Sequence, residues 1–67
     1  MDINVLFGSN VRLKRIQLGL SQERLAHMVG MDRTYLPSIE KGRRNVSLEI
    51  ASRIAQQLKV PLCDLIK

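Results

Sequence analysis

The stretch 22–42, QERLAHMVGMDRTYLPSIEKG, constrains the fold of this chain more than any other. Its first apolar face ends at Gly30, a residue that can take the left-handed backbone conformation found at the ends of helices. Asp32 is of the type that caps the start of the next helix. The stretch therefore predicts two short helices, over 22–29 and about 33–41, joined by a tight turn.

A first helix is expected over residues 1–18, with Asp2 or Asn4 as its N-cap. Its predicted buried face consists of three apolar residues on one side of a helix: Phe7, Val11 and Leu18. Gly8 is unfavourable inside a helix by about 1 kcal/mol relative to Ala. It therefore indicates either a close approach by another helix or a later helix start.

Two more helices are predicted in the last third of the chain. Ser47 can cap a helix over 48–58, and Pro61 suits the first position of a short helix over 62–66. The longer helix has its apolar residues at helical spacing: Leu48, Ala51, Ile54, Ala55 and Leu58. With 67 residues and only 3% aromatics, the chain is expected to be one all-α domain, a compact bundle of five helices spanning 1–67.

The charge of the chain favours a polyanionic partner. Eleven Lys and Arg face six Asp and Glu, a net charge of +5, which indicates DNA, RNA or an anionic membrane surface. The single cysteine, Cys63, excludes an internal disulfide and fits a reducing compartment. No apolar run approaches the length of a membrane span or a signal-peptide core. We therefore expect a cytoplasmic protein.

No enzymatic constellation is evident in the sequence. His27 is the only histidine and has no nearby cysteine, so a metal site is not expected. Glycine-rich phosphate loops, paired catalytic carboxylates and a Ser–His–Asp set are absent from the sequence. Cys63 lies in an apolar segment and is interpreted as a core or interface residue. We expect no catalysis, no cofactor and no small-molecule ligand.

The helix predicted after the turn has the properties of a probe for duplex DNA. An α-helix fits the major groove, where each base pair presents a distinct pattern of donors and acceptors. Leu36 and Ile39 would anchor the inner face of this helix. Its other side carries four residues able to hydrogen-bond: Arg33, Thr34, Tyr35 and Ser38.

Two segments, KRIQLGLSQERLAHMVG and MDRTYLPSIEKGRRNVSLE, resemble the phage-repressor and Cro-like (XRE-type) helix-turn-helix proteins. The resemblance covers about residues 7–66. Lacking a large extra domain, the chain looks most like small stand-alone members such as the controller proteins of restriction–modification systems. The resemblance implies a repressor-like five-helix domain and a transcriptional regulator that binds double-stranded DNA in a sequence-specific manner.

The resemblance also implies roles for individual residues. Base edges would be read by Arg33, Thr34 and Ser38. Phosphates would be bound by Gln22, Tyr35, Arg43, Arg44, Asn45 and Ser47. Arg15 and Glu40 match a buried pair that ties the first helix to the third. Pro37 stands where many relatives carry a small polar residue, and at the fifth position of a 33–41 helix it predicts a bend or a tight first turn.

One such domain contacts only a few base pairs, so a dimer is expected. Two-fold pairing places two probe helices about 34 Å apart on one face of a palindromic operator. The last segment offers apolar residues for a homodimer interface: Leu62, Cys63, Leu65 and Ile66. In an activator, Glu23 or a nearby acidic residue would be the candidate contact for RNA polymerase.

Two alternatives remain open: an antitoxin that represses its own operon, and a protein-interaction module that kept the fold without binding DNA. The protein-interaction module predicts neutral or acidic residues on the probe face. The arginines observed there, Arg33, Arg43 and Arg44, argue against it. An RNA-binding domain would carry more stacking aromatics. A membrane-surface peptide would concentrate its basic residues along one amphipathic helix.

Overall fold

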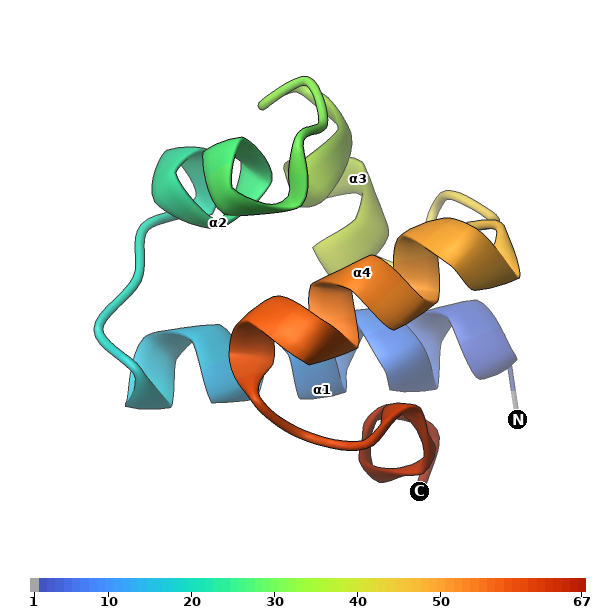
Figure 1. Cartoon of the computed structure of the whole chain (residues 1–67). Coiled ribbons are helices and arrows are strands. Elements are labelled where there is room, and N and C mark those ends of the chain that lie inside the picture. The colour runs from blue at the N-terminus through green and yellow to red at the C-terminus, as the bar shows by residue number, and fades with distance from the viewer. Residues whose placement is uncertain (1) are drawn as a thin grey trace.

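Four α-helices and a terminal 3₁₀ helix form the structure, a computed structural model that describes residues 2–67 (Figure 1). The elements are α1 (Ile3–Gln17), α2 (Gln22–Val29), α3 (Tyr35–Glu40), α4 (Leu48–Leu58) and η1 (Leu62–Leu65). No strand occurs within the described part of the chain. The all-α prediction is confirmed, but the fifth segment is a 3₁₀ helix that ends one residue earlier than expected.

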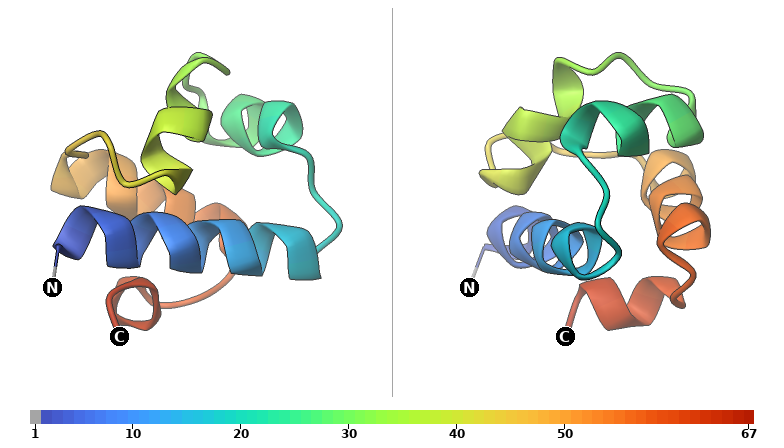
Figure 2. Two further views of the ribbon diagram at one scale, coloured as in Figure 1. Left: turned by 180° about the vertical axis from the view of Figure 1, so that it is seen from behind. Right: turned by 90° about the vertical axis from the view of Figure 1, so that its left-hand side faces the viewer.

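Each helix packs against at least two others. Helix α3 packs on α1, α2 packs on α4, and η1 closes against both α1 and α4 (Figure 2). The two short helices α2 and α3 thus lie together on one side of the molecule, and η1 lies on the opposite side (Figures 1 and 2). None of the helices in residues 2–67 combines the length and the apolar character needed to cross a membrane.

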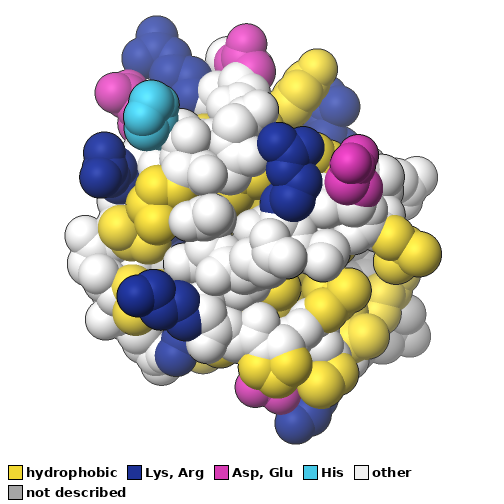
Figure 3. Space-filling view, in the orientation of Figure 1, with side chains coloured by type: hydrophobic (Ala, Val, Ile, Leu, Met, Phe, Trp, Pro, Cys, Tyr) yellow, Lys and Arg dark blue, Asp and Glu magenta, His cyan; other side chains and the backbone are white. Residues whose placement is uncertain are grey.

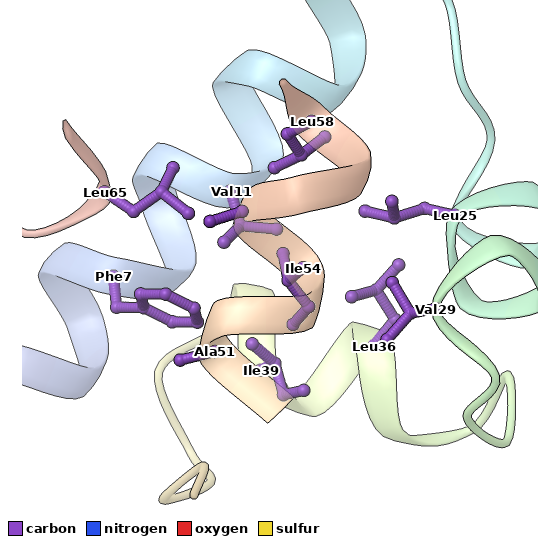
Figure 4. Close-up of a cluster of buried hydrophobic side chains, with 11 residues drawn as sticks. Phe7, Val11, Leu25, Val29, Leu36, Ile39, Ala51, Ile54, Leu58 and Leu65 are labelled. Carbon is purple, nitrogen blue, oxygen red and sulfur yellow. The ribbon is translucent and has the colours of Figure 1, made fainter. Parts of the chain in front are cut away.

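The core is aliphatic and centres on α4 (Figure 4). Four of the five residues predicted for the inner face of α4 are buried: Ala51, Ile54, Ala55 and Leu58. The prediction for Leu48 is wrong, since this side chain is 80% exposed. Leu48 is the first residue of α4 and lies at the rim of the core, where helical spacing alone cannot distinguish inside from outside.

Helix α1 begins where its capping residue predicted. The Asp2 carboxylate accepts a hydrogen bond from the Asn4 backbone N–H at 2.9 Å; Met1 lies outside the described residues. Phe7 and Val11 are buried as expected. The prediction for Leu18 is wrong: it is exposed, because it follows the last turn of the helix, where the chain turns away towards α2.

Gly8 lies where α1 and α3 touch backbone to backbone. A Cβ atom at this position would lie 2.0 Å from the carbonyl oxygen of Ile39, a distance that real Cβ atoms essentially never show. Gly8 is therefore required by the close approach of the two helices. It lies inside α1, so the alternative of a later helix start is wrong.

Helix α2 is capped at its start by a serine and ended by a glycine. The Ser21 hydroxyl accepts from the Arg24 backbone N–H at 3.0 Å at the start of α2. Gly30 ends α2 with φ of 83°, in the left-handed region that glycine occupies without strain. The chain can therefore reverse within a few residues and begin α3.

Helix α3 begins two residues later than predicted, at Tyr35 instead of Arg33. Asp32 caps a separate turn: its carbonyl accepts from the Tyr35 N–H at 3.1 Å, and its carboxylate accepts from the Thr34 N–H at 2.9 Å. Pro37 is consequently the third helical residue and not the fifth. Because the first four N–H groups of a helix have no intrahelical acceptor, its missing N–H costs no helical hydrogen bond. Helix α3 is one uninterrupted helix, and of the two predicted alternatives the structure shows the tight turn, closed between Asp32 and Tyr35 just before the helix.

Candidate nucleic-acid interface

The turn that precedes α3 presents Arg33 and Thr34 to solvent. The Asp32 carboxylate accepts both from the Thr34 backbone N–H at 2.9 Å and from the Thr34 hydroxyl at 2.8 Å. These two hydrogen bonds, first that from the backbone, hold the pKa of Asp32 below its usual value. The Thr34 side chain is therefore fixed in orientation, with its hydroxyl lone pairs still able to accept a hydrogen bond.

Arg33 is joined to α2 by an exposed ion pair. Its Nη1 lies 3.1 Å from Oε2 of Glu23, and the two side chains are 73% and 72% exposed. The pair occupies one of the two terminal nitrogens of the guanidinium group. The other N–H donors of the Arg33 fork remain available for a planar acceptor.

Tyr35 is the first residue of α3, and the side chain of Arg44 stacks on its ring. The guanidinium carbon of Arg44 lies 4.3 Å from the ring centroid, within the range of a cation–π contact. Ser38 is half-buried one turn later, and its backbone carbonyl accepts from the Arg43 N–H at 3.0 Å. The loop after α3 is thus folded back against the helix and places Arg44 beside its first turn.

The side chains of the basic loop between α3 and α4 differ in whether they form hydrogen bonds within the protein. Arg43 and Arg44 are exposed. The Asn45 side-chain oxygen accepts from the side-chain amide of Asn4 on α1, and the Ser47 hydroxyl accepts from the Ile50 N–H at 3.1 Å as the cap of α4. Asn45 and Ser47 therefore hold the loop in shape, while the two arginines project from it.

A hydrogen-bonded network ties α1, α2 and α3 together. Arg15 Nε and Nη2 donate to the two carboxylate oxygens of Glu40 at 2.7 and 3.0 Å, and Gln22 Nε2 donates to Glu40 Oε1 at 3.0 Å. Arg15 Nη1 also donates to the carbonyl of Leu20 at 2.7 Å. The hydrogen bond with Glu40 raises the pKa of Arg15 above its usual value. The network fixes the positions of the helices on either side of the turn.

The surface predicted for a partner subunit is a groove between three elements. Apolar residues of the N-terminal ends of α1 and α4 and of the C-terminal segment line a groove of about 210 Å³, including Ile3, Leu48, Leu62 and Ile66. Figure 3 shows hydrophobic side chains gathered on this side. Leu65 is buried inside the monomer and Cys63 is exposed. Leu65 therefore belongs to the core and not to the exposed surface.

Several contacts of this region are not predicted by the sequence analysis. The spacing Asp32–x–Thr34 is a local pattern of side-chain-to-backbone bonding and could have been found. The bond between Asn4 and Asn45 joins residues 41 positions apart, and that between Glu23 and Arg33 spans a turn. No spacing rule covers these two. Within residues 2–67 there is no group of three His, Cys, Asp or Glu side chains able to hold a metal ion.

Comparison with known proteins agrees with this geometry. Residues 11–65 match the family model HTH_3, described as helix-turn-helix. The chain is 42% identical over 65 residues to the control protein C.MunI of Mycoplasma sp, covering 96% of this chain and 88% of that protein.

Two solved structures are similar over nearly the whole chain. The restriction–modification controller protein C.AhdI from Aeromonas hydrophila superposes with a TM-score of 0.88 at 42% identity, covering 92% of this chain and 94% of that one. SinR, a master regulator for biofilm formation, was solved in complex with DNA and gives a TM-score of 0.86 at 27% identity, covering 91% and 98%. These relatives are regulators, which agrees with the expectation that the chain is not an enzyme.

Proposed function

Because this chain belongs to the HTH_3 helix-turn-helix family of transcriptional regulators, we propose that it binds a palindromic operator as a homodimer, with α3 directed into the major groove. The observation that carries the proposal is the exposed set around the start of α3. Arg33 and Thr34 project from its preceding turn, while Leu36 and Ile39 are buried behind them. The polar side chains can thus enter a groove while the helix stays anchored to the core.

The proposed base-reading roles follow from the hydrogen-bonding groups of Arg33, Thr34 and Ser38 that are not used within the protein. Arg33 can donate two parallel hydrogen bonds to O6 and N7 of guanine, worth about 1–3 kcal/mol of discrimination. Thr34 can accept from a base amino group or place its methyl against thymine. Ser38 is half-buried on the next turn of α3 and would read a neighbouring base pair.

Phosphate binding is proposed for the residues that surround this set. Arg43 and Arg44 are exposed cations in the loop after α3. Gln22, Tyr35, Asn45 and Ser47 would add neutral hydrogen bonds to the backbone. These contacts set the register and affinity without reading sequence, and the net charge of +5 supports them.

The homodimer is proposed to form through the apolar groove. Ile66 and Leu62 line it from the C-terminal segment, and Ile3 and Leu48 line it from α1 and α4. Three of these four residues, Ile3, Leu48 and Ile66, are exposed apolar side chains. A partner subunit seated there would remove a contiguous apolar surface from water.

The regulated genes are proposed to be those of a restriction–modification system. The support is the similarity to C.MunI and C.AhdI, each 42% identical, with matches that cover nearly all of both chains. Such a regulator acts on DNA in the cytoplasm. Whether it represses or activates depends on where the operator lies relative to the promoter.

Arg33→Ala tests the proposed reading of sequence. The wild-type protein first selects an operator from random duplexes, and binding to that operator and to random DNA is then compared by gel shift. The variant should lose about 1–3 kcal/mol of the difference between the two. Arg12→Ala, which removes an exposed arginine from α1, is the control. An unchanged ratio for Arg33→Ala would remove Arg33 from the set of readers.

Sedimentation of wild type and Ile66→Glu tests the dimer. The wild type should sediment as a dimer at micromolar concentration, and the variant as a monomer, because a carboxylate would be buried in the interface. Leu13→Glu replaces an exposed leucine of α1 outside the groove and should remain dimeric. A monomeric wild type, or a dimeric Ile66→Glu variant, contradicts this interface.

A further inference from the structure

Arg44 is held by an aromatic ring and not by a carboxylate. Its guanidinium group lies 4.3 Å from the centroid of Tyr35. Among residues 2–67, the ion pairs join Arg15 to Glu40, Arg33 to Glu23, and Lys67 to Asp64, so none involves Arg44. The stacked ring is therefore the contact that restrains the end of this long side chain.

The backbone that carries this ring is well anchored. Tyr35 is the first residue of α3, and its N–H donates to the Asp32 carbonyl at 3.1 Å. The next residue, Leu36, is fully buried in the core. Because the backbone on both sides of Tyr35 is fixed, the ring projects from a defined position on an exposed surface.

Arg43 provides the contrast within the same loop. It is the neighbouring residue, with the same charge and a similarly exposed side chain, but no described ring stacks on it. A free arginine must lose rotamer freedom when it binds a phosphate. An arginine already stacked on a fixed ring has lost part of that freedom before it meets the ligand.

We propose that Tyr35 is a positioning residue for DNA-backbone binding, which fixes the guanidinium of Arg44 beside the first turn of α3, where it meets a phosphate. The inference rests on the proposed function, in which Arg44 contacts the DNA backbone. It gives the Tyr35 ring a role separate from any hydrogen bond that its hydroxyl makes with DNA. The aromatic face carries the positioning, and the charge that reaches the phosphate belongs to Arg44.

The salt dependence of binding separates these two roles. Each phosphate neutralised by a cation steepens the slope of log K against log salt by about 0.9. Tyr35 is neutral, so losing a hydroxyl contact leaves this slope unchanged. If the ring positions Arg44, however, Tyr35→Leu should flatten the slope by up to about 0.9 per subunit, although no charge has been removed. Tyr35→Phe keeps the ring and should keep the slope.

The test measures affinity for a random-sequence duplex over a range of salt concentrations. Arg44→Gln should flatten the slope in the wild type but change it little further in the Tyr35→Leu background. Arg43→Gln is the matched control and should flatten the slope equally in both backgrounds. Helical circular dichroism of each variant establishes that it is folded before it is titrated.

A second measurement needs no DNA. A ring stacked on the guanidinium should shift the Arg44 side-chain protons upfield in the free protein. The shift should persist in Tyr35→Phe and vanish in Tyr35→Leu, while Arg43 protons stay unchanged. Absence of the shift in the wild type would overturn the inference at its first step.

The outcomes distinguish the inference from the proposed function. If Tyr35→Leu weakens binding but leaves the slope of the wild type, Tyr35 acts through its hydroxyl or through stability alone, and the positioning role is overturned. If Arg44→Gln itself leaves the slope unchanged, Arg44 does not bind phosphate. In that case the phosphate-binding part of the proposed function fails, and the inference fails with it.

Discussion

Two Arg–Glu pairs in this molecule have the same chemistry and opposite surroundings. Arg15 and Glu40 join α1 to α3 with side chains that are 12% and 2% exposed, and their closest atoms are 2.7 Å apart. Arg33 and Glu23 join the turn to α2 with side chains that are 73% and 72% exposed, at 3.1 Å. One pair lies beneath the proposed DNA-binding surface, and the other lies on it.

Because of this difference in burial, the Arg15–Glu40 pair is a structural contact, whereas the Arg33–Glu23 pair can separate at little energetic cost. A buried carboxylate that loses its partner has no water to replace it, so Arg15 and Glu40 depend on each other. In the exposed pair, water solvates both groups once they separate, and the net interaction is small. In the proposed DNA complex, Arg33 therefore exchanges Glu23 for a base edge at little cost, while Glu40 keeps α3 in place.

Among the substitutions that test this comparison, Glu40→Ala is expected to have the largest effect on stability. The change leaves the Arg15 guanidinium, in a side chain that is only 12% exposed, without its counter-ion and removes the acceptor of Gln22, so the free energy of unfolding should fall by about 3–5 kcal/mol. Urea denaturation measures it. The double variant Arg15→Met with Glu40→Leu is the control and should recover most of the loss, because apolar replacement of a buried pair is often neutral. A loss near zero for Glu40→Ala would show that the pair is not desolvated.

Glu23→Gln should have a smaller effect. Removing the exposed pair should lower the free energy of unfolding by less than about 1 kcal/mol. The matched control is Glu49→Gln, because Glu49 also lies in the first turn of its helix and so shares the favourable interaction with the helix dipole. The difference between the two variants isolates the ion pair. A large excess for Glu23→Gln would mean that Arg33 is held as firmly as Arg15.

The smallest effect is expected from the pH dependence at Asp32, an exposed carboxylate whose donors belong to its own turn. Its pKa is lowered in the folded protein by the Thr34 N–H and hydroxyl. Its stabilising contribution is therefore present above the unfolded pKa of about 3.9 and is lost as pH falls through the lower folded value. Urea denaturation of wild type and Asp32→Asn should give a constant difference near neutral pH that shrinks under acid. A difference independent of pH contradicts this account.

Most helix boundaries could be predicted because they depend on local chemistry. Asp2, Ser21 and Ser47 cap the helices that follow them, and Gly30 ends α2 in the left-handed conformation. The start of α3 was missed because two local patterns compete there. Asp32 can cap a helix, but its bonds to Thr34 close a turn first and delay the helix to Tyr35.

Burial at helix ends could not be predicted from spacing. Leu18 and Leu48 continue the apolar stripes of their helices but lie beyond the edge of the core. Leu65 shows the reverse: it lies in an apolar terminal segment for which the sequence predicts an exposed interface, but its side chain completes the core. Periodicity gives the direction of a side chain along a helix. It does not say where the neighbouring element stops.

The candidate site also has features that the sequence predicts and features that it does not. Its arginines could be identified from residue type and resemblance, and the structure brings Arg15 to Glu40 as the resemblance implied. The sequence does not predict the partners of two exposed cations, Arg33 and Arg44. Glu23 for Arg33 and Tyr35 for Arg44 are tertiary contacts across a turn or a loop, set by how α2, α3 and the basic loop pack.

The contact at Gly8 fixes the position of α3 through its backbone and does not involve the side chains proposed to meet DNA. Because the backbone of α1 meets the backbone of α3 there, the side chains on the outer face of α3 take no part in this contact. Substitutions of the proposed base-reading residues, Arg33 and Thr34 in the turn before α3 and Ser38 within it, can therefore change the preferred DNA sequence without changing the direction of the helix. A methyl group at position 8 would do the opposite, because it would move the whole helix and displace all the proposed base-reading residues at once.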